Sequence, residues 1–225
     1  MKGLLLAVAG LTAALLGSAS AADKLDPSCS GCHAMAKPAD TSLDRLLTRK
    51  GPDLWFAGSK FKKEWLVAWL QDPKPIRPAG YPYFKTVKKG DKNDVPDPSK
   101  IAAHPKLKKA DAEAAAEALM ALKAPDDLVP AGMFKGDMKG ARMGSLAFVK
   151  FRGCVACHQG DKGEGGLSGP RLTDAGVRLQ ADFIAAYTKD PQRFDPHIWM
   201  PTSNLKDQDI QRLTAFLVQL SQGDK

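Results

Sequence analysis

The sequence predicts an all-α fold built from two small helical domains in tandem. Apolar residues recur at intervals of three and four in segments 60–70 and 181–187, which is the period of an amphipathic helix. Proline landmarks recur at the same spacing in the two halves of the chain, as an internal repeat requires. No segment shows the strict alternation of apolar and polar residues that predicts a strand.

The repeat is defined by two landmarks in each half of the chain. A Gly-Pro-x-Leu segment occupies residues 51–54 in the first half and residues 169–172 in the second. An Asp-Pro pair follows each at the same distance, so that Pro73 and Pro191 correspond (73 − 52 = 21 and 191 − 170 = 21). Because proline cannot continue a helix, we expect these pairs to end the two amphipathic helices.

A further predicted helix closes each repeat, over residues 110–122 in the first and 207–220 in the second. Acidic residues in the first turn of both segments favour the helix dipole. Residues 124–140, rich in proline and glycine, are typical of a linker. The expected domains are therefore residues 22–125 and, including the linker, residues 126–225.

The first 21 residues have the layout of a secretory signal peptide. A basic Lys2 precedes an apolar run over residues 4–16, and small residues lead to a cleavage point after Ala21. The run is too short to span a bilayer comfortably, although an uncleaved membrane anchor is the alternative. No later segment is apolar and long enough for a transmembrane helix. We expect an exported, periplasmic protein with no stable membrane insertion after cleavage.

The chain carries a formal net charge of +8, and its basic excess is concentrated in the first half. A basic face attracts acidic partners over long range, and a merely solvated surface is the alternative. Nucleic acid is not an expected partner, because the chain is exported and no aromatic-and-basic recognition motif accompanies the lysines. The clustered lysines are Lys85, Lys88, Lys89, Lys92, Lys106, Lys108 and Lys109.

All four cysteines fall in two Cys-x-x-Cys-His frames, the attachment signal for c-type haem. Thiols at this spacing add to the two vinyl groups on one porphyrin edge, and the next histidine binds the iron. The sequence therefore predicts two covalently bound haem c groups, with both histidines as iron ligands. The frames hold Cys29, Cys32 and His33 in the first half, and Cys154, Cys157 and His158 in the second.

Three other uses of paired cysteines fit the sequence less well. Disulfides suit an oxidising compartment but do not need a histidine after each pair. The two pairs of a zinc site lie about 15–20 residues apart, whereas Cys32 and Cys154 are separated by 122 positions (154 − 32 = 122). A thioredoxin-like pair is expected beside a βαβ pattern, which the sequence lacks.

The layout of attachment motif, Gly-Pro-x-Leu loop, middle helix, distal loop and final helix resembles class I cytochrome c, repeated in tandem. The resemblance covers most of the mature chain and implies two helical domains, each enclosing one haem. It implies that Pro52 and Pro170 support the histidine below each haem. Residues 144–148 match the Gly-x-x-x-Phe/Tyr pattern of the family's first helix. The first repeat departs there: few mature residues precede Cys29, so its first helix must be missing or very short.

The second repeat carries a candidate for the sixth ligand of its iron in Met200-Pro201, which takes the place of the family's distal methionine. A thioether ligand raises the reduction potential relative to a second imidazole. The alternative role of Met200 is core packing, and His197 is a nearby rival ligand.

The first repeat has no methionine at that place, but His104-Pro105 precedes its final helix in the same way. We therefore expect His33 and His104 at the first iron, and His158 and Met200 at the second. An exposed structural role is the alternative for His104. Met120 is a weaker candidate because its helix position suggests the core.

These features predict a periplasmic electron carrier whose partners are redox proteins, and the basic surface suits acidic ones. Two six-coordinate irons leave no vacancy, so a small-molecule substrate and enzyme activity are not expected. The alternatives are the haem subunit of a larger periplasmic oxidoreductase complex and a dihaem peroxidase-like enzyme. A thiosulfate-oxidising dihaem enzyme fits less well, since its family uses a distal cysteine and every cysteine here is already assigned.

Overall fold

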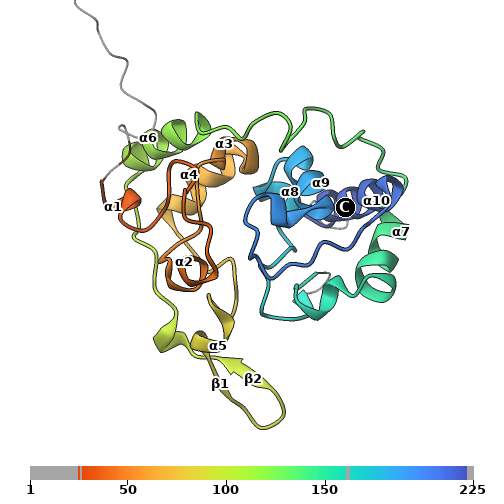
Figure 1. Ribbon diagram of the computed structural model, residues 1–225, viewed down its shortest axis with the longest axis horizontal. Coiled ribbons are helices and arrows are strands. Elements are labelled where there is room, and N and C mark those ends of the chain that lie inside the picture. Colours follow the sequence, from red (N-terminus) through yellow and green to blue (C-terminus); the bar gives the residue numbers. More distant parts are fainter. Residues whose placement is uncertain (1–24, 26, 161–162, 222–225) are drawn as a thin grey trace, which may run out of the picture.

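The structure is a computed structural model that describes residues 25, 27–160 and 163–221, and these are mostly helical (Figure 1). The first repeat contains α1 (Pro27–Ser30), α2 (Leu43–Thr48), α3 (Ala57–Lys60), α4 (Lys63–Gln71), α5 (Tyr83–Thr86), β1 (Val87–Lys89), β2 (Asp94–Pro96), the 3-10 turn η2 (Pro98–Lys100) and α6 (Lys109–Met120).

The second repeat contains α7 (Ala141–Leu146), the π-helical turn η3 (Ala147–Phe151), η4 (Cys154–Ala156), α8 (Ala175–Arg178), α9 (Ala181–Lys189), η6 (Pro191–Arg193) and α10 (Asp207–Leu220). The predicted signal peptide, residues 1–21, lies outside the described residues. Within the described part of the chain, no helix combines the length and apolar character needed to cross a membrane.

The helices at the predicted positions form, and both Asp-Pro pairs end theirs. The N–H of Asp72 donates to Ala68 O at 3.3 Å at the end of α4, and the N–H of Asp190 donates to Ala186 O at 3.1 Å at the end of α9. The expected helix over residues 60–70 is shorter, however, because α3 ends at Lys60 and α4 starts only at Lys63.

The expectation of a chain without strands is wrong at one place. Strands β1 and β2 pair as an antiparallel hairpin, with Lys88 opposite Val95. Each strand has three residues, which is too short for an alternating pattern to be recognised. The hairpin lies in the stretch that the first repeat inserts before its final helix, and it projects from the body of the molecule (Figure 1).

From the Gly-Pro loop to the Asp-Pro pair, the two repeats contain equivalent elements at an offset of 118 residues (170 − 52 = 118). With this offset the bounds of α3 become those of α8, and the bounds of α4 become those of α9. The connection between each pair of helices contains equivalent residues, Phe61 and Leu179, which face each other in an isolated antiparallel bridge. The repeats therefore meet through the same element of each.

Each repeat donates one backbone hydrogen bond to the other at this bridge, and the two bonds join equivalent residues. The N–H of Lys62 donates to Arg178 O at 3.0 Å, and the N–H of Gln180 donates to Lys60 O at 2.9 Å. Since Lys62 corresponds to Gln180 and Lys60 to Arg178, the two halves pack about an approximate two-fold axis at this point.

Small residues allow the final helix of each repeat to pack closely. A Cβ atom on Gly58 of α3 would overlap the backbone of Met120 at the end of α6. A Cβ atom on the equivalent Gly176 of α8 would lie 2.6 Å from Val218 Cα in α10. Gly144 of α7 likewise approaches the backbone of Arg212, so α7 crosses α10 in close contact.

Candidate haem-binding sites

Each Cys-x-x-Cys-His frame folds into a single helical turn. The N–H of His33 donates to Cys29 O at 2.9 Å, and the N–H of His158 donates to Cys154 O at 3.1 Å. In each frame the second cysteine is exposed and the first is partly buried, and none of the four, all of which are described, forms a disulfide. Both turns therefore hold two thiols outside any disulfide, beside the histidine that follows them.

The two histidines have equivalent hydrogen-bond partners, each the carbonyl oxygen of the proline in its Gly-Pro loop. Nδ1 of His33 lies 2.8 Å from Pro52 O, and Nδ1 of His158 lies 2.8 Å from Pro170 O. A carbonyl oxygen can only accept, so Nδ1–H donates and Nε2 keeps its lone pair for a metal. Burial lowers the pKa of both imidazoles, which favours the neutral form that binds metal. The proline contacts that the family resemblance implies are present in both repeats.

A glycine lies against each of these imidazoles. A Cβ atom on Gly169 would lie 2.6 Å from Nδ1 and Cε1 of His158, and a Cβ atom on Gly51 would lie 2.7 Å from Nδ1 of His33. Real Cβ contacts of this length do not occur. Only glycine at these two positions lets the loop hold the ring in place.

The structure brings His104 to His33. Their ring centres are 6.2 Å apart, with an angle of 41° between the rings. The ring of Trp69, from α4, lies 4.8 Å from that of His104. Nδ1 of His104 lies 2.9 Å from Pro105 O, which again leaves Nε2 for another partner. The sequence places these histidines 71 positions apart (104 − 33 = 71), so their approach is a property of the fold.

Met200 and its rival His197 lie in the loop between η6 and α10. Met200 is partly buried and His197 is exposed. The N–H of His197 donates to the Asp195 side chain at 3.1 Å. Among the other sulfur candidates, Met120 ends α6 and its backbone faces Gly58, while Met35 is two residues from His33.

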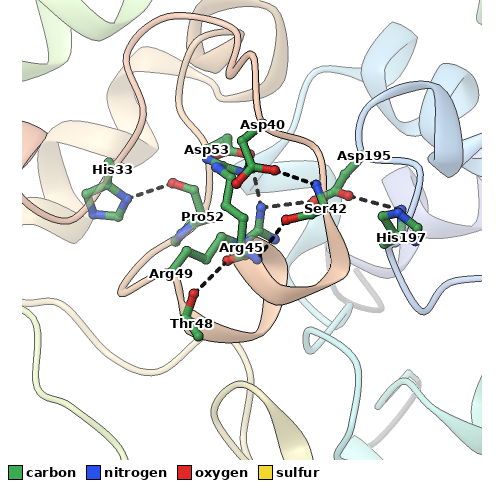
Figure 2. A network of polar contacts seen from close by, with 10 residues as sticks. All are labelled: His33, Asp40, Ser42, Arg45, Thr48, Arg49, Pro52, Asp53, Asp195 and His197. Carbon is green, nitrogen blue, oxygen red and sulfur yellow. Dashed lines mark hydrogen bonds and ion pairs between the residues drawn. The ribbon is translucent and has the colours of Figure 1, made fainter.

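An ion-pair network connects the loop that holds His33 to the second repeat (Figure 2). Asp53, buried next to Pro52, pairs with Arg45 at 2.6 Å and with Arg49 at 3.0 Å. Arg49 also reaches Asp195 of the second repeat, at 3.1 Å. Two cations and two carboxylates meet here, so the formal charge of the network is zero.

Two further cations occupy equivalent positions beside the histidines. Lys60 and Arg178 each act electrostatically on the histidine of their own repeat, His33 and His158. Burial, followed by repulsion from Arg178, lowers the pKa of Lys60 to about 7. Burial also lowers the pKa of Arg178. Lys60 forms no ion pair among the described residues, whereas the buried Arg178 pairs with Asp174 at 3.5 Å.

These surroundings fit a haem with its anionic propionates. Trp55 Nε1, Tyr81 Oη and Arg178 Nε are buried without a hydrogen-bond partner among the described residues. A buried donor without a partner is costly, and more so beside a cation. A group with two carboxylates beside His158 would accept a hydrogen bond from Arg178 Nε, and one beside His33 would balance the charge of Lys60. The paired thiols, the Nε2 lone pairs of the two histidines and these cations together suit haem c.

Sequence reasoning did not find Lys60 or Arg178, although a signal for them exists. Each follows the landmark proline of its repeat by eight residues (60 − 52 = 8 and 178 − 170 = 8). A basic residue at the same place in both copies of a repeat is more informative than either alone. Tyr81 has a signal of the same kind, since it corresponds to Trp199 (199 − 81 = 118), whereas Trp55 corresponds to Thr173 and has none (173 − 55 = 118).

Comparison with known proteins bears on the second repeat. The family model described as Cytochrome c matches residues 141–221, which run from the first residue of α7 to just beyond α10. Searches of curated proteins and of solved structures gave no match. Residues 141–221 thus match a cytochrome c domain that includes the second Cys-x-x-Cys-His frame, and this match supports covalently bound haem c and a role in electron transport.

Proposed function

We propose that the protein is an exported carrier of electrons with two haem c groups, one in each repeat. The observation that carries the proposal is that the two histidine sites have the same local geometry. In both, a Cys-x-x-Cys-His turn precedes a histidine whose Nδ1 lies 2.8 Å from the carbonyl oxygen of a Gly-Pro loop. Bound haem supplies reversible one-electron chemistry between ferric and ferrous iron.

In this proposal His33 and His104 bind one iron from opposite sides. An imidazole nitrogen binds a transition metal at about 2 Å, so two imidazoles on opposite sides of one metal have ring centres roughly 6 Å apart. The separation of 6.2 Å between these rings supports that arrangement. His158 and Met200 hold the second iron, with Met200 supplied by the loop before α10.

The two ligand sets predict which of the two sites has the higher reduction potential. A methionine ligand raises the reduction potential relative to a second histidine, so the His158 site has the higher potential. Electrons therefore settle at the second repeat. With side chains on both faces of each iron there is no position for a substrate, which favours a carrier over a peroxidase-like enzyme. Rapid peroxide-dependent oxidation of a reductant by the purified protein would contradict this assignment.

An exposed aromatic pair next to Met200 supports a docking surface for a redox partner. Phe84 of α5 and Trp199 are 54% and 49% exposed, and their rings stack at 6.0 Å and 27°. Exposed aromatic side chains are enriched at protein interfaces. Lys85 of α5 and three lysines of the hairpin that follows it, Lys88, Lys89 and Lys92, are exposed as well. We infer that the partner docking here is acidic.

Charge reversal on the hairpin tests the docking surface. Lys88→Glu combined with Lys89→Glu should slow oxidation of the reduced protein by ferricyanide, an anionic probe, by up to about tenfold at low salt. The difference should shrink as ionic strength rises. The control is Lys108→Glu combined with Lys109→Glu, which makes the same change of net charge at the start of α6. Equal effects of the two double variants would contradict a local docking surface.

A spectroelectrochemical titration of the mature holoprotein tests the proposed function. We expect two one-electron transitions with different spectra, a His/His site at lower potential and a His/Met site at higher potential. One transition only, or a site that stays five-coordinate, would contradict the proposal.

A further inference from the structure

Arg77 belongs to the first repeat but lies at the histidine loop of the second. Its Nη1 donates to Ser168 O at 2.8 Å, directly before the Gly-Pro pair that holds His158. The backbone on both sides of Arg77 also bonds to this loop. The N–H of Arg171 donates to Ile76 O at 2.8 Å, and the N–H of Ala79 donates to Leu167 O at 3.4 Å. The segment around Arg77 is thus fastened along this loop.

The charge of Arg77 is poorly compensated. Among the described residues it forms no ion pair with a carboxylate, and its guanidinium lies over the Tyr81 ring, 5.3 Å from the ring centre. Burial lowers the pKa of Arg77, and the charge of Arg77 in turn contributes to the lowered pKa of His158. An unbalanced positive charge therefore acts on the imidazole of the second site.

The equivalent position in the second repeat carries the opposite charge. At the offset of 118 residues Arg77 corresponds to Asp195, which reaches back to Arg49 at 3.1 Å in the loop of His33. The charge of Asp195 is neutralised there, because Arg45 and Arg49 pair with Asp53 and Asp195 (Figure 2). The approximate two-fold axis thus relates an unbalanced cation at one site to a neutral network at the other.

From this asymmetry we propose that Arg77 raises the reduction potential of the iron held by His158, and so acts across the repeats as a tuning residue. Reduction of ferric to ferrous iron adds one electron and removes one positive charge from the site. A nearby cation in a partly buried setting favours the added electron. The inference rests on the proposed function, since it needs haem at His158. It does not depend on the identity of the sixth ligand.

The test compares Arg77→Gln, Arg77→Lys and Lys74→Gln in the mature dihaem protein. Arg77→Gln should lower the midpoint potential of the second site by at least 59 mV, which corresponds to a tenfold change in the ratio of reduced to oxidised iron for one electron. The first site should move less. Arg77→Lys should keep most of the potential. Lys74→Gln removes the same charge from an exposed side chain three residues away and should change neither site.

Ser168→Asp provides a second arm that leaves Arg77 in place. The new carboxylate should pair with the guanidinium and lower the potential of the second site in the same direction. If Arg77→Gln does not accumulate as folded protein, the potential measured in Ser168→Asp tests the proposal instead.

The proposal is overturned if the second potential is unmoved in Arg77→Gln or Ser168→Asp while both haems are present. It is also overturned if Arg77→Gln and Arg77→Lys lower the potential equally, because a purely structural role would do that. A wild-type protein without haem at His158 would overturn the proposed function itself, and the mass of the protein distinguishes that result.

Discussion

Replacing Gly169 with alanine tests the geometry that holds the second histidine. The new Cβ would lie 2.6 Å from Nδ1 and Cε1 of His158 and 2.8 Å from Cys157 O. Ordinary contacts between carbon atoms start at about 3.5 Å, so the ring or the loop must move by roughly 0.9 Å. A movement of this size stretches the 2.8 Å contact between His158 and Pro170 beyond the usual range of a hydrogen bond.

The expected cost combines overpacking, about 1–3 kcal/mol, with a weakened hydrogen bond of about 0.5–1.5 kcal/mol. Gly169→Ala should therefore lower the free energy of unfolding by roughly 2–4 kcal/mol in a denaturant titration. It should also change the spectrum of the second site alone.

The matched control is Gly31→Ala, in the first attachment motif. Its Cβ would come no closer than 3.5 Å to Ser28 O, so stability and both spectra should stay close to those of the wild type. A Gly169→Ala protein with wild-type stability and an unchanged second site would refute the reasoning.

Three further predictions concern the first iron, the contact between the repeats and the alkaline range. His104→Ala should convert the first site from six-coordinate low-spin to five-coordinate, seen in its absorption spectrum, and leave the second site unchanged. Arg49→Ala leaves Asp195 without its partner and should lower the free energy of unfolding by about 1–3 kcal/mol in a denaturant titration, since both side chains are mostly buried. Burial raises the pKa of Tyr187 to about 12, so stability should fall between about pH 10 and pH 12, where only the unfolded chain ionises, and Tyr187→Phe should reduce this fall in stability measured against pH.

Each of these predictions has a control that isolates its cause. Met120→Ala, at the weaker candidate ligand, should keep the first site six-coordinate. Lys63→Ala removes an exposed pair with Glu117 and should cost well under 1 kcal/mol. Tyr83→Phe should leave the alkaline fall in place. A six-coordinate spectrum in His104→Ala, equal costs for Arg49 and Lys63, or an unaltered pH profile in Tyr187→Phe would each contradict the corresponding argument.

The sequence predicted those features whose signals are local. Cys-x-x-Cys-His, the Gly-Pro loops and the helix-ending Asp-Pro pairs each depend on a few neighbouring residues, and the structure contains them where they were expected. The final helices, α6 and α10, lie within three residues of their predicted bounds. Here the periodicity of apolar residues and the helix-ending prolines point to the same elements.

The features that sequence reasoning missed depend on contacts between the repeats. The bridge between Phe61 and Leu179 interrupts the predicted helix at residue 60, because Lys60 and Lys62 use their backbone groups to bond the other repeat. The contact of Arg77 with the loop of His158 spans 91 residues. Neither position differs locally from an ordinary surface segment, so only the packing of the two halves reveals them.

The resemblance to the cytochrome c family is stronger in the second repeat than in the first. The second repeat has the crossing of α7 and α10 and the match to the cytochrome c family model. In the first repeat α1 is a single turn that includes Cys29. The geometry around His33 nevertheless repeats that around His158, and the proposal of a second haem rests on this point.

The mass of the mature protein, produced in a host that attaches haem c, tests the central proposal most directly. We predict an added mass of two haem groups, and one haem fewer when either Cys29 and Cys32 or Cys154 and Cys157 are replaced by alanine. A wild-type protein that carries a single haem, retained when Cys29 and Cys32 are replaced, would contradict it.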